Sequence, residues 1–440
     1  MYMNLQFFAE AGTLVNGTEN YVNAGTGETI SFTDSKTLSP ELKAFYDTEL
    51  LENARTELFY AQFAKRQPLP ANHKGQVEWR KWNTFDRAAK LTEGVIPTGQ
   101  KFGVTTVTGA VDQYGTYTAI TDKLELRAYD DVILGATEEM GASAAETQEK
   151  LIRDALYTGT NVLYCDKLTL SSGAVAASVT AESGLVEDTT YGCRLTPETI
   201  NKAVTILKKN RVPRIGGRYY AVIHPSVAHD LRQSEGWIEA HKYAAPEELF
   251  NGEIGELHGV RFIENVFAPV LKGANLAGEV RALTLGADLS ASAVTEITYS
   301  ASGVTLAADA LKGRKIMING VAATVTANTA SSGTHKITVA STNFGAGTSG
   351  TTKIYPGEHA RDGVACYATY FFGKDAFGII DPEGGALEMI IHDKGEIGGP
   401  LNQFSTIGYK FETNGATILY PERLLRVMST SSFSSSDDEN

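Results

Sequence analysis

The chain has 440 residues, of which 42% are hydrophobic and 21% are charged, and its formal net charge is −13. These values indicate a globular protein of two or three domains, and the acidic charge excludes one that wraps nucleic acid with its whole surface. Enclosing nucleic acid is not excluded, because enclosure does not require adhesion. Three cysteines are too few for a disulfide framework, so we expect reduced thiols; a bond between Cys165 and Cys193 is the alternative.

The start of the chain does not read as a signal peptide. The start, "MYMNLQFFAE", has no basic segment and no small-residue cleavage site, and no apolar stretch approaches the length of a membrane span. We therefore expect a soluble protein made in the cytoplasm, with no membrane partner. The polar, acidic end of the chain predicts a disordered tail over residues 431–440.

The first elements are an arm and a helix. Residues 1–38 are rich in Gly, Thr and Asn and predict an extended arm. Ser39 is a good N-cap, and apolar residues then recur at helical spacing, which predicts a helix within residues 39–70 that Pro68 and Pro70 end.

Residues 71–121 read as a long two-stranded excursion. Val77 and Trp79 alternate with Glu78 and Arg80, and a run rich in Val and Thr resumes strand character after a polar middle. Two strands alone bury too little surface to be stable in water, so such an arm needs another surface to lie on. The alternative is an ordinary hairpin packed on its own domain.

A long helix and an α/β portion follow. Asp130 can cap a helix that runs to about Tyr157 and spans roughly 40 Å, and residues 167–190 are a small surface insertion rich in Ser, Ala and Gly. Thr196 opens another helix, which carries Ile200, Val204 and Leu207 on one face. The string "RYYAVIHPSVAHDLR" predicts a strand, a turn at Pro225 and a short helix capped near Ser226.

Residues 290–353 differ in composition from the rest of the chain. They have few charges, much Ala, Thr, Ser and Gly, and short Val/Ile runs between turn residues, which predicts an all-β module with a hairpin at Asn319–Gly320. From His359 onward the chain reads as consecutive strands, with a second hairpin at Asn414–Gly415.

Two pairs of polar residues are the strongest candidates for chemistry, and neither pattern supports it. Lys374–Asp375 lies between apolar runs. A phosphate loop would need a glycine at position 368, where Ala368 stands, and Ser or Thr after the lysine, where Asp375 stands. We interpret it as a turn in which the preceding glycine supplies backbone freedom. His224 and His229 lack the intervening glutamate of a metalloprotease helix, and the eight histidines are too scattered for a metal site. We expect no enzyme, no metal and no cofactor.

The order of several local strings resembles one family, the major capsid proteins of tailed bacteriophages with the Hong Kong-97-type capsid fold. The similarity covers most of residues 36–430, interrupted at 167–190 and 290–353. The strings that carry it are "TLSPELKAFYDTELLENA" before "RQPLP", "GQVEWRKWNTF" with "LTEGVIPTGQK", "DALYTG", "YYAVIHPSVAHDLR", and "FGKDAFG" followed by "GYKFETNGATILYPERLLRV".

The resemblance implies an α+β chain with an N-terminal arm, an extended β-hairpin loop on a neighbouring subunit, a peripheral domain with a long spine helix, an axial domain and an inserted all-β module. It implies these parts: arm 1–38, peripheral helix 39–70, extended loop 71–121, peripheral domain 122–193, axial domain 194–289, inserted module 290–353, returning axial and peripheral strands 354–430, tail 431–440.

The implied function is self-assembly into the icosahedral head shell of a phage, built of pentamers and hexamers that enclose packaged double-stranded DNA without sequence-specific binding. The implied partners are further copies, a portal protein, decoration proteins and, since no long charged helical segment precedes the fold, a separate scaffolding protein. The chain would assemble in the host cytoplasm and reside in the virion. The candidate intersubunit residues in the loop are Trp79, Trp82, Phe85, Lys90, Lys101 and Phe102.

Some relatives form covalent crosslinks between subunits in this loop. Nothing here marks a partner asparagine or an assisting acid for Lys90 or Lys101, so crosslinking is not predicted. The rival interpretation is a secreted β-rich surface or adhesion protein, which the Thr/Ser/Gly-rich stretches favour and the missing signal peptide opposes.

Overall fold

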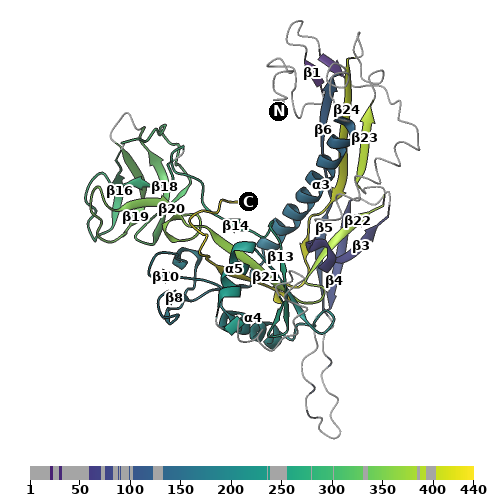
Figure 1. The fold of residues 1–440 in the computed structure, drawn as a ribbon, viewed down its shortest axis with the longest axis horizontal. Helices are drawn as coiled ribbons and strands as arrows, with labels where there is room; N and C mark the ends of the chain where they lie inside the picture. Colours follow the sequence, from purple (N-terminus) through teal and green to yellow (C-terminus); the bar gives the residue numbers. More distant parts are fainter. Residues whose placement is uncertain are drawn as a thin grey trace. The chain divides into compact units, whose positions relative to one another are not determined.

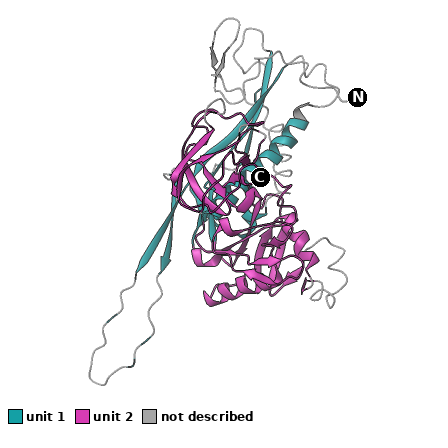
Figure 2. Ribbon diagram, turned by 90° about the vertical axis from the view of Figure 1, so that its left-hand side faces the viewer, with its two compact units in different colours: residues 1–158, 377–419 teal, residues 159–376, 420–440 magenta. Residues whose placement is uncertain are grey.

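The computed structural model divides the chain into two compact units, which Figure 2 colours separately. Unit 1 comprises residues 1–158 and 377–419, and unit 2 comprises residues 159–376 and 420–440. No helix in the described part of the chain is long and apolar enough to cross a membrane. The structure describes residues 20–22, 29–31, 59–70, 75–82, 88, 90, 99, 103–121, 132–234, 236–237, 255–278, 280–300, 302–330, 335–383, 387–392 and 403–440.

Unit 1 is built from a long helix and several small sheets. Its sheets have the strand orders β1-β2, β4-β5, β25-β22-β3 and β23-β24-β6. Its elements are β1 (Asn20–Val22), β2 (Thr29–Ser31), the 3₁₀ helix η2 (Tyr60–Phe63), β3 (Lys65–Leu69), β4 (Gln76–Trp82), β5 (Val104–Ala110), β6 (Asp112–Thr121), α3 (Val132–Tyr157), β22 (Phe377–Pro382), β23 (Glu388–His392), β24 (Phe404–Thr413) and β25 (Thr417–Ile418).

The helix α3 packs on the sheet formed by β23, β24 and β6, as Figure 1 shows. Its 26 residues agree with the predicted helix, although Asp130, the predicted cap, lies outside the described residues. Alternate residues of β24 point toward the helix: Ile407 and Phe411 join Met140 in one apolar cluster. Together these residues form a core within unit 1.

The segment before strand β4 differs from the prediction of a helix within 39–70. Residues 65–69 form strand β3, which pairs in parallel with β22, while residues 39–58 lie outside the described residues. Pro68 cannot donate a backbone hydrogen bond, and this is tolerated because β3 is the edge strand of its sheet. Pro68 and Pro70, predicted to end a helix, therefore lie in and beside an edge strand.

The predicted excursion over 71–121 is shorter in the structure. Strands β4 and β5 form an antiparallel ribbon from Gln76↔Ala110 to Trp82↔Val104. The Val111 backbone N–H donates to the Gly75 carbonyl over 2.9 Å and closes the base of this ribbon. Strand β6 belongs elsewhere, because all ten of its residues pair with β24. The sequence reading merged β5 and β6 because both are Thr-rich strands with only Val111 between them.

Unit 2 contains a seven-stranded mixed sheet, a small three-stranded sheet and a six-stranded sheet. Its elements are β7 (Val162–Tyr164), β8 (Lys167–Thr169), β9 (Val175–Ala177), η3 (Glu182–Gly184), β10 (Tyr191–Gly192), α4 (Pro197–Lys209), β11 (Tyr219–Ile223), α5 (Pro225–Gln233), β12 (Glu256–Leu257), β13 (Val260–Glu264), β14 (Val270–Leu271), β15 (Leu283–Thr284), β16 (Val294–Thr298), β17 (Lys315–Ile318), β18 (Val321–Asn328), β19 (Lys336–Thr342), β20 (Lys353–Pro356), η4 (Arg361–Gly363), β21 (Cys366–Phe372), η5 (Pro421–Arg423) and β26 (Leu424–Ser429).

The seven-stranded sheet is the buried centre of unit 2. Strand β21 lies between β11 and β26, and every residue of β21 and β26 is buried. The helix α4 begins as predicted: Thr196 is its N-cap, and the Thr196 hydroxyl accepts a hydrogen bond from the Thr199 N–H. The helix α5 begins earlier than predicted, since its cap is His224, whose Nδ1 accepts from the Ser226 N–H.

The predicted β module is a closed six-stranded barrel with wider limits than 290–353. Its strands run in the order β15-β20-β17-β18-β19-β16, and an antiparallel bridge between Leu285 and Tyr299 joins the first strand to the last. One apolar cluster fills it and includes residues from Leu276 to Ile354. Asn319 and Gly320 form the predicted hairpin, with φ of 49° and 79°. The predicted limits miss β15 and the last residues of β20.

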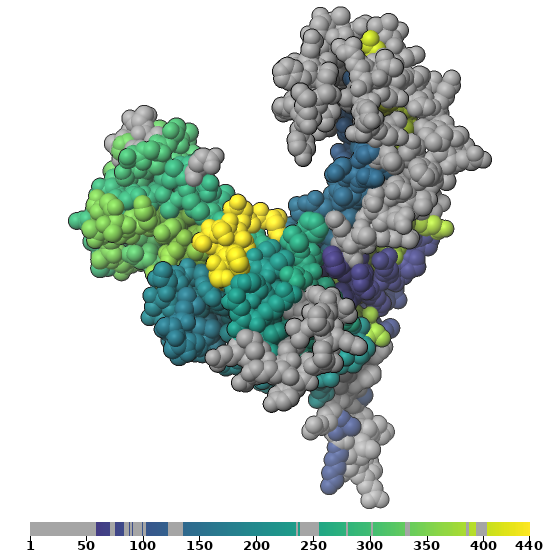
Figure 3. All heavy atoms as spheres, in the orientation of Figure 1, coloured from purple at the N-terminus to yellow at the C-terminus, as the bar shows by residue number. Residues whose placement is uncertain are grey.

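The end of the chain is ordered and docked on unit 2, so the prediction of a disordered tail over 431–440 is wrong. Asp437 accepts hydrogen bonds from the hydroxyls of Ser226, at 2.5 Å, and Tyr367, at 2.6 Å. Lys272 pairs with Asp438 over 3.0 Å. The end of the chain is the yellow surface in Figure 3. The polar composition that suggested disorder instead supplies hydrogen bonds to a polar surface.

Candidate functional site

The predicted interface residues lie on or near the β4–β5 ribbon. Neighbouring side chains on a strand point to opposite faces, so Trp79 and Trp82 face opposite ways. Trp79 is only 8% exposed, whereas Trp82 is 56% exposed. Lys90 is exposed, while Phe85, Lys101 and Phe102 lie outside the described residues.

Trp79 is buried within its own unit and anchors the ribbon there, and its assignment as an intersubunit residue stays a prediction. A Cβ on Gly109 would lie 2.8 Å from the Trp79 ring, and one on Gly378 would lie 3.0 Å from it. These two glycines, on β5 and β22, therefore leave the space that the indole fills. Its Nε1 is buried and has no hydrogen-bond partner among the residues that the structure describes, so packing of the ring is what holds Trp79 in place.

The other face of the ribbon presents an apolar pair to solvent. Trp82 and Val104 are directly opposite each other in the register, and Val104 is 43% exposed. Paired apolar side chains of this kind, on an exposed two-stranded ribbon, are typical of a surface that contacts another protein.

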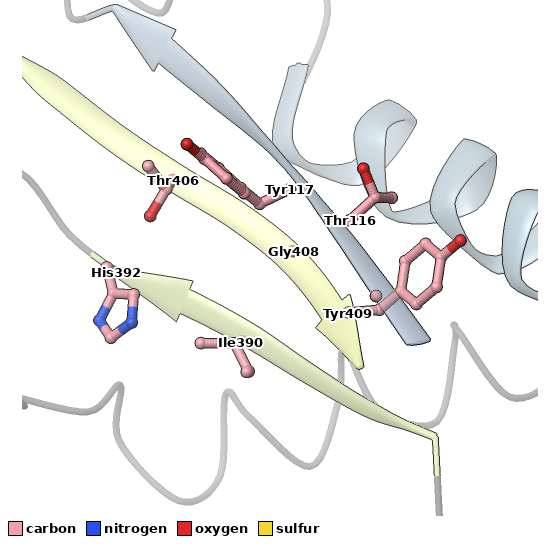
Figure 4. Close-up of a pocket in the computed structure, with 8 residues that line it drawn as sticks. Thr116, Tyr117, Ile390, His392, Thr406, Gly408 and Tyr409 are labelled. Atoms are coloured by element: carbon pink, nitrogen blue, oxygen red, sulfur yellow. The ribbon is translucent and has the colours of Figure 1, made fainter. Parts of the chain in front are cut away.

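A second candidate surface is the face of the β23–β24–β6 sheet that points away from α3 (Figure 4). It is hollowed into a pocket of about 320 Å³, lined mainly by Tyr117, Ile390, His392 and Thr406. Gly408 permits this arrangement, since a Cβ there would lie 2.7 Å from the Cβ of Tyr117. This face could not be predicted from the sequence, because it forms only where β6 pairs with β24, a strand far away in the chain.

The Lys374–Asp375 pair is a turn, as predicted, but the residue in the left-handed conformation is not the preceding glycine. Asp375 adopts the left-handed conformation, with φ of 56°. Gly373 is required for close approach, because a Cβ there would lie 2.6 Å from the Pro213 carbonyl oxygen. The turn joins β21 of unit 2 to β22 of unit 1, so the strands on either side of it belong to different sheets.

The Asn414–Gly415 turn is not the predicted hairpin. Strand β24 pairs with β6 and β23, whereas β25 pairs with β22. Gly415 has a φ of 62°, so the dipeptide does form a turn, but it leads the chain from one sheet to another. Local turn chemistry predicts the reversal, and it does not determine the partner of the next strand.

The other residues considered for chemistry do not converge. His224 caps α5, whereas the His229 side chain is 49% exposed and contacts Gln233 over 3.1 Å. All three cysteines are free and buried, and burial raises the pKa of the Cys165 and Cys366 thiols. Among the described residues, no group of three or more His, Cys, Asp or Glu is placed to hold a metal ion.

A sequence profile of the phage capsid protein family matches residues 104–387, which is more than half of the chain. The chain belongs to the phage capsid protein family. It is a major capsid protein that forms the icosahedral shell of a phage head, and its fold is mixed α+β. The rival interpretation, a secreted adhesion protein, is not favoured. No curated protein sequence matches the chain.

Several solved phage capsids are similar to this capsid protein in structure. The cyanophage Pam1 capsid has a TM-score of 0.49 at 11% identity, and the match covers 94% of this chain and 98% of its own. The capsid of cyanophage P-SCSP1u has a TM-score of 0.48 at 13% identity, covering 98% of this chain and 99% of its own. The capsid of Ralstonia phage GP4 has a TM-score of 0.47 at 13% identity, covering 87% and 92%.

Proposed function

We propose that this capsid protein builds its shell in the Hong Kong-97 manner, by exchange of arms and loops between copies. In this proposal residues 1–38 are the N-terminal arm and the β4–β5 ribbon is the extended loop. Unit 1 supplies the peripheral domain with α3 as its spine, and the seven-stranded sheet of unit 2 is the axial domain at the centres of pentamers and hexamers.

The observation that carries the proposal is the exposed face of the ribbon. Trp79 fixes the base of the ribbon in unit 1, so the ribbon is held as part of its own subunit. Trp82 and Val104 remain exposed on the opposite face, in an isolated chain. Burying them against a second copy would remove apolar surface from water, which is the dominant favourable term in most protein association.

The barrel also has a proposed position in the shell. Its entry and exit lie close together, because a Cβ on Gly273 would lie 2.8 Å from Pro356. An insertion is tolerated where the chain leaves and re-enters at nearby points. We assign the barrel to the outer surface of the shell, where additional mass does not compete with packaged DNA and where it can contact neighbours or a host surface.

The partners in this proposal are further copies of the chain, a separate scaffolding protein, a portal protein and decoration proteins. Assembly takes place in the host cytoplasm, and the finished shell encloses double-stranded DNA without reading its sequence. No catalytic step is required of the subunit, since association of preformed surfaces is sufficient to build the shell.

The experiment that tests loop exchange removes the exposed apolar pair. We expect Trp82→Ser with Val104→Ser to leave the folded subunit intact and to reduce the yield of closed particles at least tenfold, measured by sucrose-gradient sedimentation and electron microscopy. The matched control is Val175→Ser with Val266→Ser, two exposed valines outside the ribbon and the barrel. Equal particle yields from the two double variants would contradict the proposal.

A further inference from the structure

A run of basic residues begins in the last turn of helix α4 and continues beyond its end. Between Glu198 and Asp230 the chain has no acidic residue, and the segment 208–218 contains Lys208, Lys209, Arg211, Arg214 and Arg218. This concentration contrasts with the whole chain, which has 39 basic and 52 acidic residues. The segment is therefore a local reversal of charge on an acidic protein.

The end of α4 holds this run in a defined loop. The Arg211 N–H donates to the Lys208 carbonyl over 3.0 Å, and Arg211 itself is in the left-handed conformation with φ of 53°. Val212 is buried and its carbonyl accepts a hydrogen bond from the Tyr219 hydroxyl over 2.9 Å. The buried valine anchors the loop, and the charged side chains on either side of it remain in solvent.

The Lys374 turn packs beside this loop. The Lys374 N–H donates to the Pro213 carbonyl over 3.0 Å, and the close approach depends on Gly373. Arg423 steadies the same turn: its Nη1 donates to the Lys374 carbonyl over 3.0 Å, and its guanidinium lies 3.7 Å from the Tyr420 ring centroid. Segments far apart in sequence thus bring their cations to one surface.

We call this surface the basic patch and define it as Lys208, Lys209, Arg211, Arg214 and Lys374. All five side chains are exposed. Within the part of the chain that the structure describes, no carboxylate forms an ion pair with any of them. Arg218 is not included, because it pairs with Glu256 over 2.7 Å. The patch is therefore a group of uncompensated positive charges that suits a polyanion.

The composition of the patch favours a nucleic acid over an acidic protein. Protein interfaces are anchored by buried aromatic or large apolar residues, and lysine is depleted in them. None of the exposed large apolar residues in the described part of the chain belongs to the patch; they are Trp82, Val104, Val175, Val266, Val321 and Phe433. Exposed Lys and Arg without an apolar anchor are typical of contacts to a phosphate backbone.

We propose that the basic patch is a sequence-independent contact for the phosphate backbone of double-stranded DNA. This proposal rests on the proposed function, because it places the patch on the face of the shell that meets the packaged genome. Five cations on each subunit bind locally, while the net charge of −13 keeps the remaining surface from adhering. The DNA is thereby held weakly at regular points and is not wrapped.

The test measures binding of the full-length, unassembled chain to a fluorescent 30-base-pair duplex at several salt concentrations. If five phosphates are contacted, affinity should fall about 500-fold between 50 and 200 mM salt, and about 40-fold for Lys208→Gln with Lys209→Gln. The matched control, Lys312→Gln with Lys315→Gln, removes two exposed lysines of the barrel and should keep the wild-type salt dependence.

Two results would overturn the proposal. The first is an identical salt dependence for the two double variants. The second is tighter binding to polyglutamate than to DNA of equal charge, which would assign the patch to an acidic protein. Shell formation by the same variants is followed separately by electron microscopy. Wild-type chain that binds DNA through the patch and never forms shells would overturn the proposed function and leave the DNA contact standing.

Discussion

At the scale of single residues, the two tryptophans of β4 have opposite surroundings although only three positions separate them. Trp79 fills a space between glycines of two other strands, whereas Trp82 is largely in solvent. We expect Trp79→Ala to lower the free energy of unfolding by about 3–5 kcal/mol, because it leaves a cavity. Trp82→Ala should change it by no more than about 0.5 kcal/mol. Chemical denaturation of unassembled subunits measures both.

Assembly should reverse the order of the two effects. Subunits with Trp82→Ala should fold and yet form few particles, whereas Trp79→Ala should reduce particles only in proportion to its loss of folded subunit. Equal destabilisation by the two substitutions would mean that Trp82 is also a core residue, and the ribbon would then lose its role as an intersubunit contact.

The stability of the folded chain depends on pH through His224. Burial lowers its pKa in the folded chain, and Asp437 opposes this only in part. Above pH 6.5, the ordinary pKa of histidine, the ring is neutral in both the folded and the unfolded chain. Below it the unfolded chain binds the proton first, so stability is lost as pH falls from 6.5 through the lower folded pKa.

The variant that tests this is His224→Asn, because asparagine keeps an acceptor for the Ser226 N–H and does not titrate. We expect the wild type to lose more Tm than this variant between pH 7.5 and pH 5.0. His229→Asn, at a half-exposed position, is the control and should behave as the wild type. A wild-type acid loss that His224→Asn fails to reduce would exclude this histidine as its source.

At the scale of elements, deleting the barrel tests whether the rest of the subunit folds without it. Replacing residues 276–356 by a short Gly/Ser linker removes the whole barrel between points that lie close together. We expect the shortened subunit to remain folded, with the circular dichroism and cooperative melting of a native protein. Replacing only residues 290–353 should fail, because it leaves β15 and Ile354 with no core to enter. Failure of both deletions would make the barrel an integral part of unit 2.

Elements with strong local signals were predictable from the sequence, and those determined by distant pairing were not. Helix α4 has an N-cap, a proline at its first position and an apolar stripe, and it forms where these indicate. Strand β3 carries no such signal, because it exists only through its parallel pairing with β22, more than 300 residues away. The tail is similar: its serines and aspartates carry no local signal of order, because their partners lie on α5, on β21 and at Lys272.

The candidate site was predictable to a similar extent. The ribbon and its tryptophans were found, but which indole is buried depends on Gly378, which belongs to a strand at the far end of the chain. The basic patch was not recognised, because Lys374 joins residues 208–214 only through the contact between two turns. Periodicity within one segment carries no information about such contacts.

At the scale of the whole molecule, the exposed ribbon, the open sheet face and the basic patch have no purpose in a monomer. A chain of two units with these surfaces should be found in pentamers, hexamers or closed shells under assembly conditions. Soluble subunits should therefore be transient when the protein is produced together with the products of its neighbouring genes.

Shell formation is decided by electron microscopy of the purified full-length protein, produced alone and with those gene products. We expect closed shells of uniform diameter with fivefold and sixfold clusters in at least one of the two preparations. A well-folded species that stays strictly monomeric by light scattering, with no particles in either preparation, would contradict it.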